Sequence, residues 1–210
     1  MPMNKKLKFF LLAVAALFCF VVFTYLVKKG VFNSFDFDTT VRLQNNISRR
    51  FDSILSLFSL IGDFQVISIF LIVALFLFRK IKAILILLFY IIVNFIELYA
   101  KYFIHHLPPP HFLLRTQEIV QFPQYYVQAV NSYPSGHSAR TVFITVILVF
   151  LLQRAKKLSR NAKITFYFLL FTFDLIMLVS RIYLGEHWST DVIGGAFLGF
   201  AFAIGSLIFI

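Results

Sequence analysis

Charged residues are scarce in this chain, and acidic residues are the scarcest. Only 14% of its 210 residues are charged and only 9 are Asp or Glu, whereas 60% are hydrophobic and 29 are Phe. This is more apolar surface than a soluble globule can bury. The composition therefore excludes a soluble protein and indicates an integral membrane protein.

Cysteine and linker sequences are also nearly absent. Cys19 is the only cysteine, so no intramolecular disulfide is possible. The chain has no low-complexity tract, no fixed-period repeat and no Gly/Ser-rich linker. We therefore predict a single membrane-embedded domain over residues 1–210.

Six apolar runs are candidates for membrane spans. A helical span needs about 20 apolar residues, and continuous runs favour helices over the alternating strands of a barrel. We therefore predict an all-α bundle of six transmembrane helices, the second interrupted at Gly62 and Asp63 and the fourth short. The runs are Phe9–Val27, Ser53–Phe78, Ala83–Phe103, Ala139–Leu152, Ile164–Leu184 and Val192–Ile210.

Lys and Arg gather in short segments that contain no Asp or Glu, namely the N-terminus and the links 79–82 and 154–163. An excess of Lys and Arg in short loops marks the cytoplasmic side. We therefore expect both termini in the cytoplasm and residues 27–52, 101–138 and 180–191 on the outer side. The net charge of +11 reflects this topology and contact with anionic lipid, so we expect no nucleic-acid partner.

Three further spacings predict local structure. Residues 35–51 alternate apolar and charged positions, which predicts an amphipathic helix on the outer surface; a membrane-surface role without a catalytic one is the favoured interpretation. Glu97 lies four residues before Lys101, a spacing that favours an ion pair. Gly195 and Gly199 have the GxxxG spacing that is typical of close helix packing.

Three polar segments fall on the predicted outer side. They are KYFIHHLPPP at 101–110, YPSGHSAR at 133–140 and SRIYLGEHWSTD at 180–191. In an up-and-down bundle these segments share one membrane face. Residues that are distant in sequence can therefore converge there on one pocket.

The residue types in these segments suit the handling of a phosphate. If residues 187–191 are helical, Asp191 can hold one nitrogen of His187 and leave the other free, which makes His187 a candidate nucleophile. His137 could protonate the leaving oxygen. The helix start at Ser135 and Gly136 offers backbone N–H groups to an anion. Three cations could bind the phosphoryl oxygens: Lys101, Arg140 and Arg181.

The predicted outer face carries no Asp/Glu cluster, so no two-metal site is evident and we expect a metal-independent reaction without a cofactor. His105, His106 and His111 lie beside three prolines. They lack the regular ligand spacing of zinc motifs, so a metal site there is disfavoured.

These motifs resemble the type 2 phosphatidic acid phosphatase superfamily, which also includes the vanadium haloperoxidases. The resemblance rests on PSGH at 134–137 and on Ser-Arg, five residues, His, three residues and Asp at 180–191. The stretches FDSILSLFSLIGD and DVIGGAFLG also resemble that family, so the likeness covers most of the chain. It implies a bacterial-type lipid phosphatase with a six-helix fold, an outward-facing active site and a phosphohistidine intermediate.

The resemblance also implies residue roles. His187 resembles the nucleophile, Asp191 its orienting partner and His137 the acid for the leaving group. The phosphate-binding residues of the family correspond to Lys101, Ser135, Gly136 and Arg181.

The family's first motif is incomplete in this chain. Its usual form is a lysine, six residues and Arg-Pro, but Lys101 is followed after six residues by Pro108 and another proline. His105 or His106 could occupy the space of the arginine. We hypothesise instead that Arg140, three residues beyond the histidine of PSGH, replaces the missing cation.

The leading functional prediction is hydrolysis of a lipid phosphate or diphosphate at the outer face of a bacterial plasma membrane. A polyprenyl diphosphate such as undecaprenyl diphosphate is the first candidate, followed by phosphatidic acid and phosphatidylglycerol phosphate. The short loops leave little room for a soluble-substrate domain, so the expected partners are the lipid phosphate and the bilayer. The alternatives are a lipid phosphotransferase that uses the same intermediate and a non-catalytic lipid-binding or transport protein.

Overall fold

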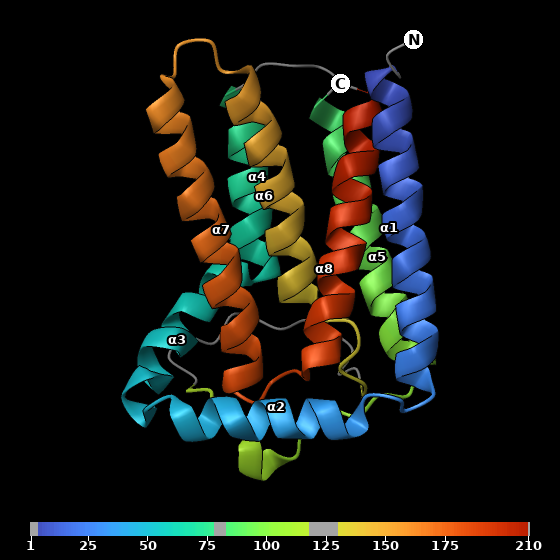
Figure 1. Cartoon of the computed structure of the whole chain (residues 1–210), viewed down its shortest axis with the longest axis vertical. Coiled ribbons are helices and arrows are strands. Elements are labelled where there is room, and N and C mark those ends of the chain that lie inside the picture. The colour runs from blue at the N-terminus through green and yellow to red at the C-terminus, as the bar shows by residue number, and fades with distance from the viewer. Residues whose placement is uncertain (1–3, 78–82, 118–129, 210) are drawn as a thin grey trace.

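The computed structural model of the protein describes residues 4–77, 83–117 and 130–209, and within these ranges every regular element is helical. The long helices run side by side as a bundle, and α2 lies across one end of it (Figure 1). The α-helices are α1 (Lys5–Lys28), α2 (Asn33–Asn46), α3 (Asp52–Ser59), α4 (Phe64–Leu77), α5 (Ala83–Phe103), α6 (Gly136–Arg154), α7 (Arg160–Tyr183) and α8 (Ser189–Ser206). Four short 3-10 helices accompany them: η1 (Arg49–Phe51), η2 (Leu60–Gly62), η3 (His111–Leu113) and η4 (Leu207–Phe209).

The prediction of an all-α membrane bundle is confirmed, with one change in the second span. Among the described residues, five helices are long and apolar enough to cross a membrane, and a broken segment from Arg49 to Val73 makes a sixth if it is counted as one span. This segment bends by 51° between Gly62 and Phe64. The residue at the break, Asp63, leaves the helical conformation, with φ of −63° and ψ of 149°. The predicted second span is therefore a bent pair of helices.

The three polar segments lie at one end of the bundle, as predicted. α1 begins and α8 ends at the opposite end, where the link between α6 and α7 also lies (Figure 1). The end of α5, the start of α6 and the turn from α7 to α8 all lie toward α2 (Figure 1). The fourth span is longer than its apolar run suggested, because α6 begins at Gly136 inside the PSGH segment and continues to Arg154.

Close packing of α6 against α8 fixes the position of the PSGH segment along α8. A Cβ added at Gly199 would lie 2.1 Å from the Ala139 carbonyl oxygen, and one added at Gly195 would lie 2.2 Å from the Ser135 carbonyl oxygen. The close helix packing predicted from the GxxxG spacing is confirmed. The starts of the two helices are therefore held side by side.

The predicted surface helix is α2, and its polar side faces the bundle. Asp36, Thr40 and Gln44 are buried at a spacing of four residues, whereas Phe35 is exposed. The Gln44 amide donates to the Tyr183 carbonyl at the end of α7, at 2.9 Å. The buried side of α2 is therefore polar, and its exposed side carries two phenylalanines among polar residues.

Gly199→Ala should destabilise the protein by about 1–3 kcal/mol, because the added methyl group overlaps the backbone of α6. The midpoint of thermal unfolding in detergent, followed by circular dichroism, measures the effect. Gly205→Ala is the matched control on the same helix, since its Cβ would meet only the ring of Phe89, at 3.1 Å, and a side chain can shift. Equal midpoints for the two variants would contradict the close α6–α8 contact.

Candidate active site

His187 and Asp191 meet, although they do not share a helix. α8 begins at Ser189, so His187 lies in the turn before it. His187 Nδ1 lies 3.3 Å from Asp191 Oδ2, which also accepts a hydrogen bond from the Trp188 backbone N–H at 2.9 Å. Asp191 is fully buried in the first turn of α8, where the helix dipole favours a negative charge. Nε2 is therefore the His187 nitrogen that does not contact Asp191.

The surroundings of His187 keep its imidazole neutral. Burial lowers the pKa of His187 because desolvation disfavours the charged form, and the positive charges of Lys101 and Arg181 act in the same direction. The hydrogen bond and charge of Asp191 oppose this shift without reversing it. The free-base form of His187 is therefore favoured near pH 7.

His137 pairs with a carboxylate that the sequence analysis missed. Its Nε2 lies 3.0 Å from Asp63 Oδ1, at the bend between α3 and α4. A Cβ added at the neighbouring Gly62 would lie 2.7 Å from the His137 ring, so the bend packs directly on the imidazole. The sequence analysis treated Gly62 and Asp63 only as an interruption of a span. A carboxylate within an apolar run is costly unless it is paired, and that was the available signal.

Two of the predicted cations share one carboxylate on α5. Lys101 Nζ lies 2.6 Å from Glu97 Oε1, and Arg140 Nη1 lies 3.2 Å from Glu97 Oε2. The predicted ion pair between Glu97 and Lys101 is therefore confirmed. Arg140 Nε also donates to the Gly62 carbonyl, at 3.2 Å. These contacts place Arg140 beside the bend that packs on His137.

Arg181 is buried in the last turn of α7 and forms an ion pair with Glu186. Glu186 also accepts a hydrogen bond from the Thr116 hydroxyl. Within the described ranges, Arg181 Nε and Ser135 Oγ are buried without a hydrogen-bond partner. Each buried unpaired polar group costs about 1–3 kcal/mol. These two atoms are therefore suited to an anionic ligand.

The backbone of the PSGH segment joins the two motifs. The Ser135 N–H donates to the Asp191 carbonyl at 2.9 Å. A Cβ added at Gly136 would lie 2.6 Å from Arg140 Nη1, so this position also packs against the cations. The predicted site residues therefore converge at one end of the bundle. The positive charges of Arg181, Arg140 and Lys101 act on His137.

Pro108, where the family motif has arginine, lines a separate cavity. This cavity of about 570 Å³ lies between the ends of α1 and α2 and the segment 105–110, and Trp188 also lines it. Arg140, by contrast, lies among the other predicted cations. Its position suits the hypothesis that it supplies the missing charge.

A second histidine, His106, also contacts Asp191. His106 Nδ1 lies 2.8 Å from Asp191 Oδ1, and His106 Nε2 lies 3.8 Å from Asp36 Oδ2. Asp36 accepts hydrogen bonds from the Thr190 N–H at 2.8 Å and from the Thr190 hydroxyl at 2.7 Å. From the sequence, we considered His106 as a disfavoured metal ligand and as a substitute for the arginine, and we favoured no catalytic role for the helix that became α2. The polar stripe at every fourth residue of α2 was the missed signal.

The carboxylates of the site pair with basic side chains. In the part of the chain that the structure describes, no group of three or more His, Cys, Asp or Glu side chains could hold a metal. The carboxylates near His137 and His187 are instead each engaged by a histidine, an arginine or a lysine.

The chain belongs to the PAP2 superfamily, whose family model matches residues 82–210. A segment of 69 residues is 39% identical to phosphatidylglycerophosphatase B of Bacillus subtilis (strain 168) and covers 32% of this chain. The chain thus matches about a third (34%) of the length of that curated relative.

The fold is similar to those of two solved structures. One is the transmembrane PAP2 type phosphatidylglycerolphosphate phosphatase from Bacillus subtilis, with a TM-score of 0.75, 18% identity and coverage of 93% of this chain and 94% of that one. The other is LpxE from Aquifex aeolicus, with a TM-score of 0.61, 25% identity and coverage of 82% of this chain and 94% of that one. The first comparison shows that the shared fold extends well beyond the segment matched by the family model.

Asp36→Ala should destabilise the protein by about 1–3 kcal/mol, because it leaves the Thr190 N–H and hydroxyl without their acceptor. Thermal unfolding in detergent measures the loss. Asp38→Ala is the matched control, since Asp38 lies on the same helix but is exposed. If the two variants unfolded at the same temperature, the stabilising role of the hydrogen bonds from Thr190 to Asp36 would be contradicted.

Proposed function

We propose that the protein hydrolyses the phosphate of a membrane lipid through a phosphohistidine intermediate, without a metal. The observation that carries this proposal is the convergence of the His187–Asp191 pair with His137 and three cations at one end of an apolar bundle. Membership of the PAP2 superfamily supports the same chemistry.

The proposed reaction has two steps. His187 Nε2 attacks phosphorus while the bond to the lipid oxygen breaks, and His137 gives its proton to that oxygen. Water then attacks the phosphohistidine and passes a proton to His137, and the N–P bond breaks to release phosphate. Asp191 stabilises the positive charge that develops on His187. Asp63 holds the His137 ring in position.

The phosphoryl oxygens have several donors near the two histidines. Arg181 Nε and Ser135 Oγ, both buried and unpaired within the described ranges, can each donate to one oxygen. The cations Lys101 and Arg140 stay paired with Glu97 until a phosphate arrives. A dianion is attractive enough to share these cations, since charge-assisted hydrogen bonds are about twice as strong as neutral ones.

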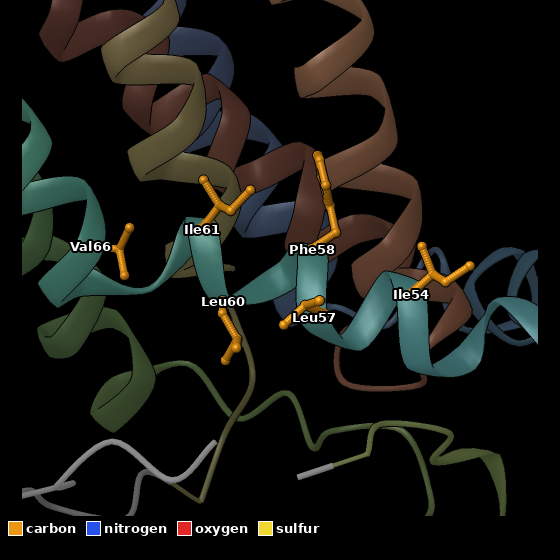
Figure 2. Close-up of a pocket in the computed structure, with 6 residues that line it drawn as sticks. All are labelled: Ile54, Leu57, Phe58, Leu60, Ile61 and Val66. Carbon is orange, nitrogen blue, oxygen red and sulfur yellow. The ribbon is translucent and has the colours of Figure 1, made fainter. Parts of the chain in front are cut away.

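An apolar groove beside the bend provides a place for a lipid tail. It has a volume of about 480 Å³ and follows α3, η2 and the first turn of α4. Its lining residue Ile61 directly precedes Gly62 and Asp63, which contact Arg140 and His137. A lipid with its phosphate at His187 can therefore lay an acyl or prenyl chain along this groove. Figure 2 shows the lining residues, Ile54, Leu57, Phe58, Leu60, Ile61 and Val66.

Phosphatidylglycerol phosphate is the first substrate to test, because the curated relative and the solved structure from Bacillus subtilis carry that activity in their names. The sequence analysis placed a polyprenyl diphosphate first, and this lipid and phosphatidic acid are the next candidates. The Lys and Arg bias of the short links supports an active site on the outer face with both termini in the cytoplasm. Transfer of the phosphoryl group to a second lipid is the alternative, which analysis of labelled products would reveal.

His187→Ala should reduce phosphate release by about 10⁴-fold or more, because no other group replaces the nucleophile. The assay uses purified protein in detergent with phosphatidylglycerol phosphate, a polyprenyl diphosphate, phosphatidic acid and a water-soluble phosphate monoester. We expect release from at least one lipid, little from the soluble ester, and no loss in the presence of a chelator.

His111→Ala is the control for this assay, since His111 is exposed and lies outside the site. Release by His187→Ala at the wild-type rate would contradict the phosphohistidine route. If the wild type released phosphate from none of the lipids, the non-catalytic alternative would hold.

Arg140→Ala should lower kcat/KM by about 10²-fold, because it removes a cation that balances the charge of the transition state. Glu97 keeps Lys101 as its partner in this variant, so the protein should still fold. Arg160→Ala, an exposed arginine at the start of α7, is the control. Wild-type efficiency in Arg140→Ala would refute the hypothesis that Arg140 replaces the missing family arginine.

A further inference from the structure

Two histidines divide one carboxylate between them. His106 Nδ1 lies 2.8 Å from Asp191 Oδ1, and His187 Nδ1 lies 3.3 Å from Asp191 Oδ2. Asp191 is fully buried, so its negative charge acts strongly on both imidazoles. The contact with His106 is the shorter of the two. His106 therefore interacts more strongly with the Asp191 charge than His187 does.

The backbone of His106 is held independently of its ring. Its N–H donates to Asn131 Oδ1 at 3.1 Å, and its carbonyl accepts from the Ser132 N–H at 2.9 Å and the Ser132 hydroxyl at 3.0 Å. The Asn131 amide also donates to the Lys101 carbonyl at 2.9 Å. The segment that carries His106 is thus tied to the end of α5. These backbone contacts hold His106 where its ring can contact Asp191.

The two rings differ in their charge state. Burial opposes a charge on His106, but the hydrogen bond and charge of Asp191, together with the charge of Asp36, outweigh burial and raise the pKa of His106. The pKa of His187 is lowered, as described above. A proton is therefore favoured on His106 over His187. Pairs of titratable groups pushed apart in this way are typical of sites that need one acid and one base.

We propose that His106 is a positioning residue for the reaction: as an imidazolium it occupies one oxygen of Asp191, and this keeps His187 uncharged with Nε2 free for attack. The inference rests on the proposed function, because it assigns His187 as the nucleophile. His106 acts through Asp191 and does not bind the phosphate. Its ring contacts Asp191 and Asp36, whereas the cations gather around Glu97 and Glu186.

Several other charged groups face the two rings, and the experiment leaves all of them in place. On the His106 side are Asp36 of α2, Tyr133, whose ring centroid is 6.2 Å away, and the lysines and His105 of the adjoining cavity. The groups that act on the charge of His187 are Asp191, Lys101, Arg181, Glu97 and His137. These groups set the starting pKa of His187, and only the charge of His106 changes in the test.

His106→Asn tests this role. The amide Nδ2 of Asn can still donate to Asp191 Oδ1, but it carries no positive charge. Asp191 then stabilises the protonated form of His187 more strongly. We expect the pKa of His187 to rise and the acid limb of the pH profile of kcat/KM to move upward by about one pH unit, with the rate at the optimum within a few fold of wild type.

The pKa of His187 is read by NMR titration of its imidazole in detergent, with the resonance assigned from its loss in His187→Ala. His111→Asn, at an exposed histidine, is the matched control and should leave both readouts unchanged. An unchanged His187 titration in His106→Asn, or a rate that falls equally at every pH, would overturn the proposal. His106→Ala, which also loses the hydrogen bond, should raise the pKa of His187 at least as far.

The NMR readout separates this inference from the proposed function. If His187→Ala retained activity, the phosphohistidine route would fail, but the titration would still show whether His106 shares Asp191. If His187→Ala were inactive and His106→Asn left the titration of His187 unchanged, the proposed function would stand and the role of His106 would fall.

Discussion

The carboxylate of Asp191 joins parts of the chain that are far apart in sequence. It accepts from His106 after α5, from His187 in the turn after α7 and from the backbone of Trp188. The carbonyl of the same residue accepts from Ser135 at the start of α6. A buried carboxylate without such donors would cost several kcal/mol. The end of the bundle can therefore close only when these segments reach Asp191 together.

The arrangement of α2 follows from the same constraint. A helix that covers the end of a membrane bundle meets backbone groups and charged side chains there, so its inward side is polar. Asp36 meets the start of α8, and Gln44 meets the end of α7. The exposed aromatic residues on the outer side of α2 can contact the lipid interface. This helix thus covers the end of the bundle at which the site lies.

The sequence predicted the features that depend on local pattern. Apolar runs placed the spans, the GxxxG spacing placed the contact between α6 and α8, and the spacing of Glu97 and Lys101 placed an ion pair. Motif resemblance pointed to His137, His187 and Asp191, and the structure brings these three residues together. Each of these conclusions needs only the period of a helix or a known spacing.

The features that were missed depend on contacts between distant segments. Asp63 is 74 residues from His137 in sequence, and only the bend between α3 and α4 brings the two together. His106 contacts Asp191, which lies 85 residues further along the chain. Spacing gives no access to such pairs. A general rule gives such access, because an ionisable residue in an apolar chain needs a partner. A search for the partners of Asp36 and Asp63 would have led to both contacts.

Charge pairing explains how this cluster of cations can be buried in an apolar bundle. Lys101 and Arg140 are held by Glu97, and Arg181 is held by Glu186, so no cation of the cluster lies buried alone. Uncompensated buried charges would cost more than the bundle can supply. A phosphate that enters must share these cations with the carboxylates, and part of its binding energy offsets that competition. Contacts of the lipid tail with the apolar groove can supply the balance, which favours a lipid phosphate over a small soluble ester.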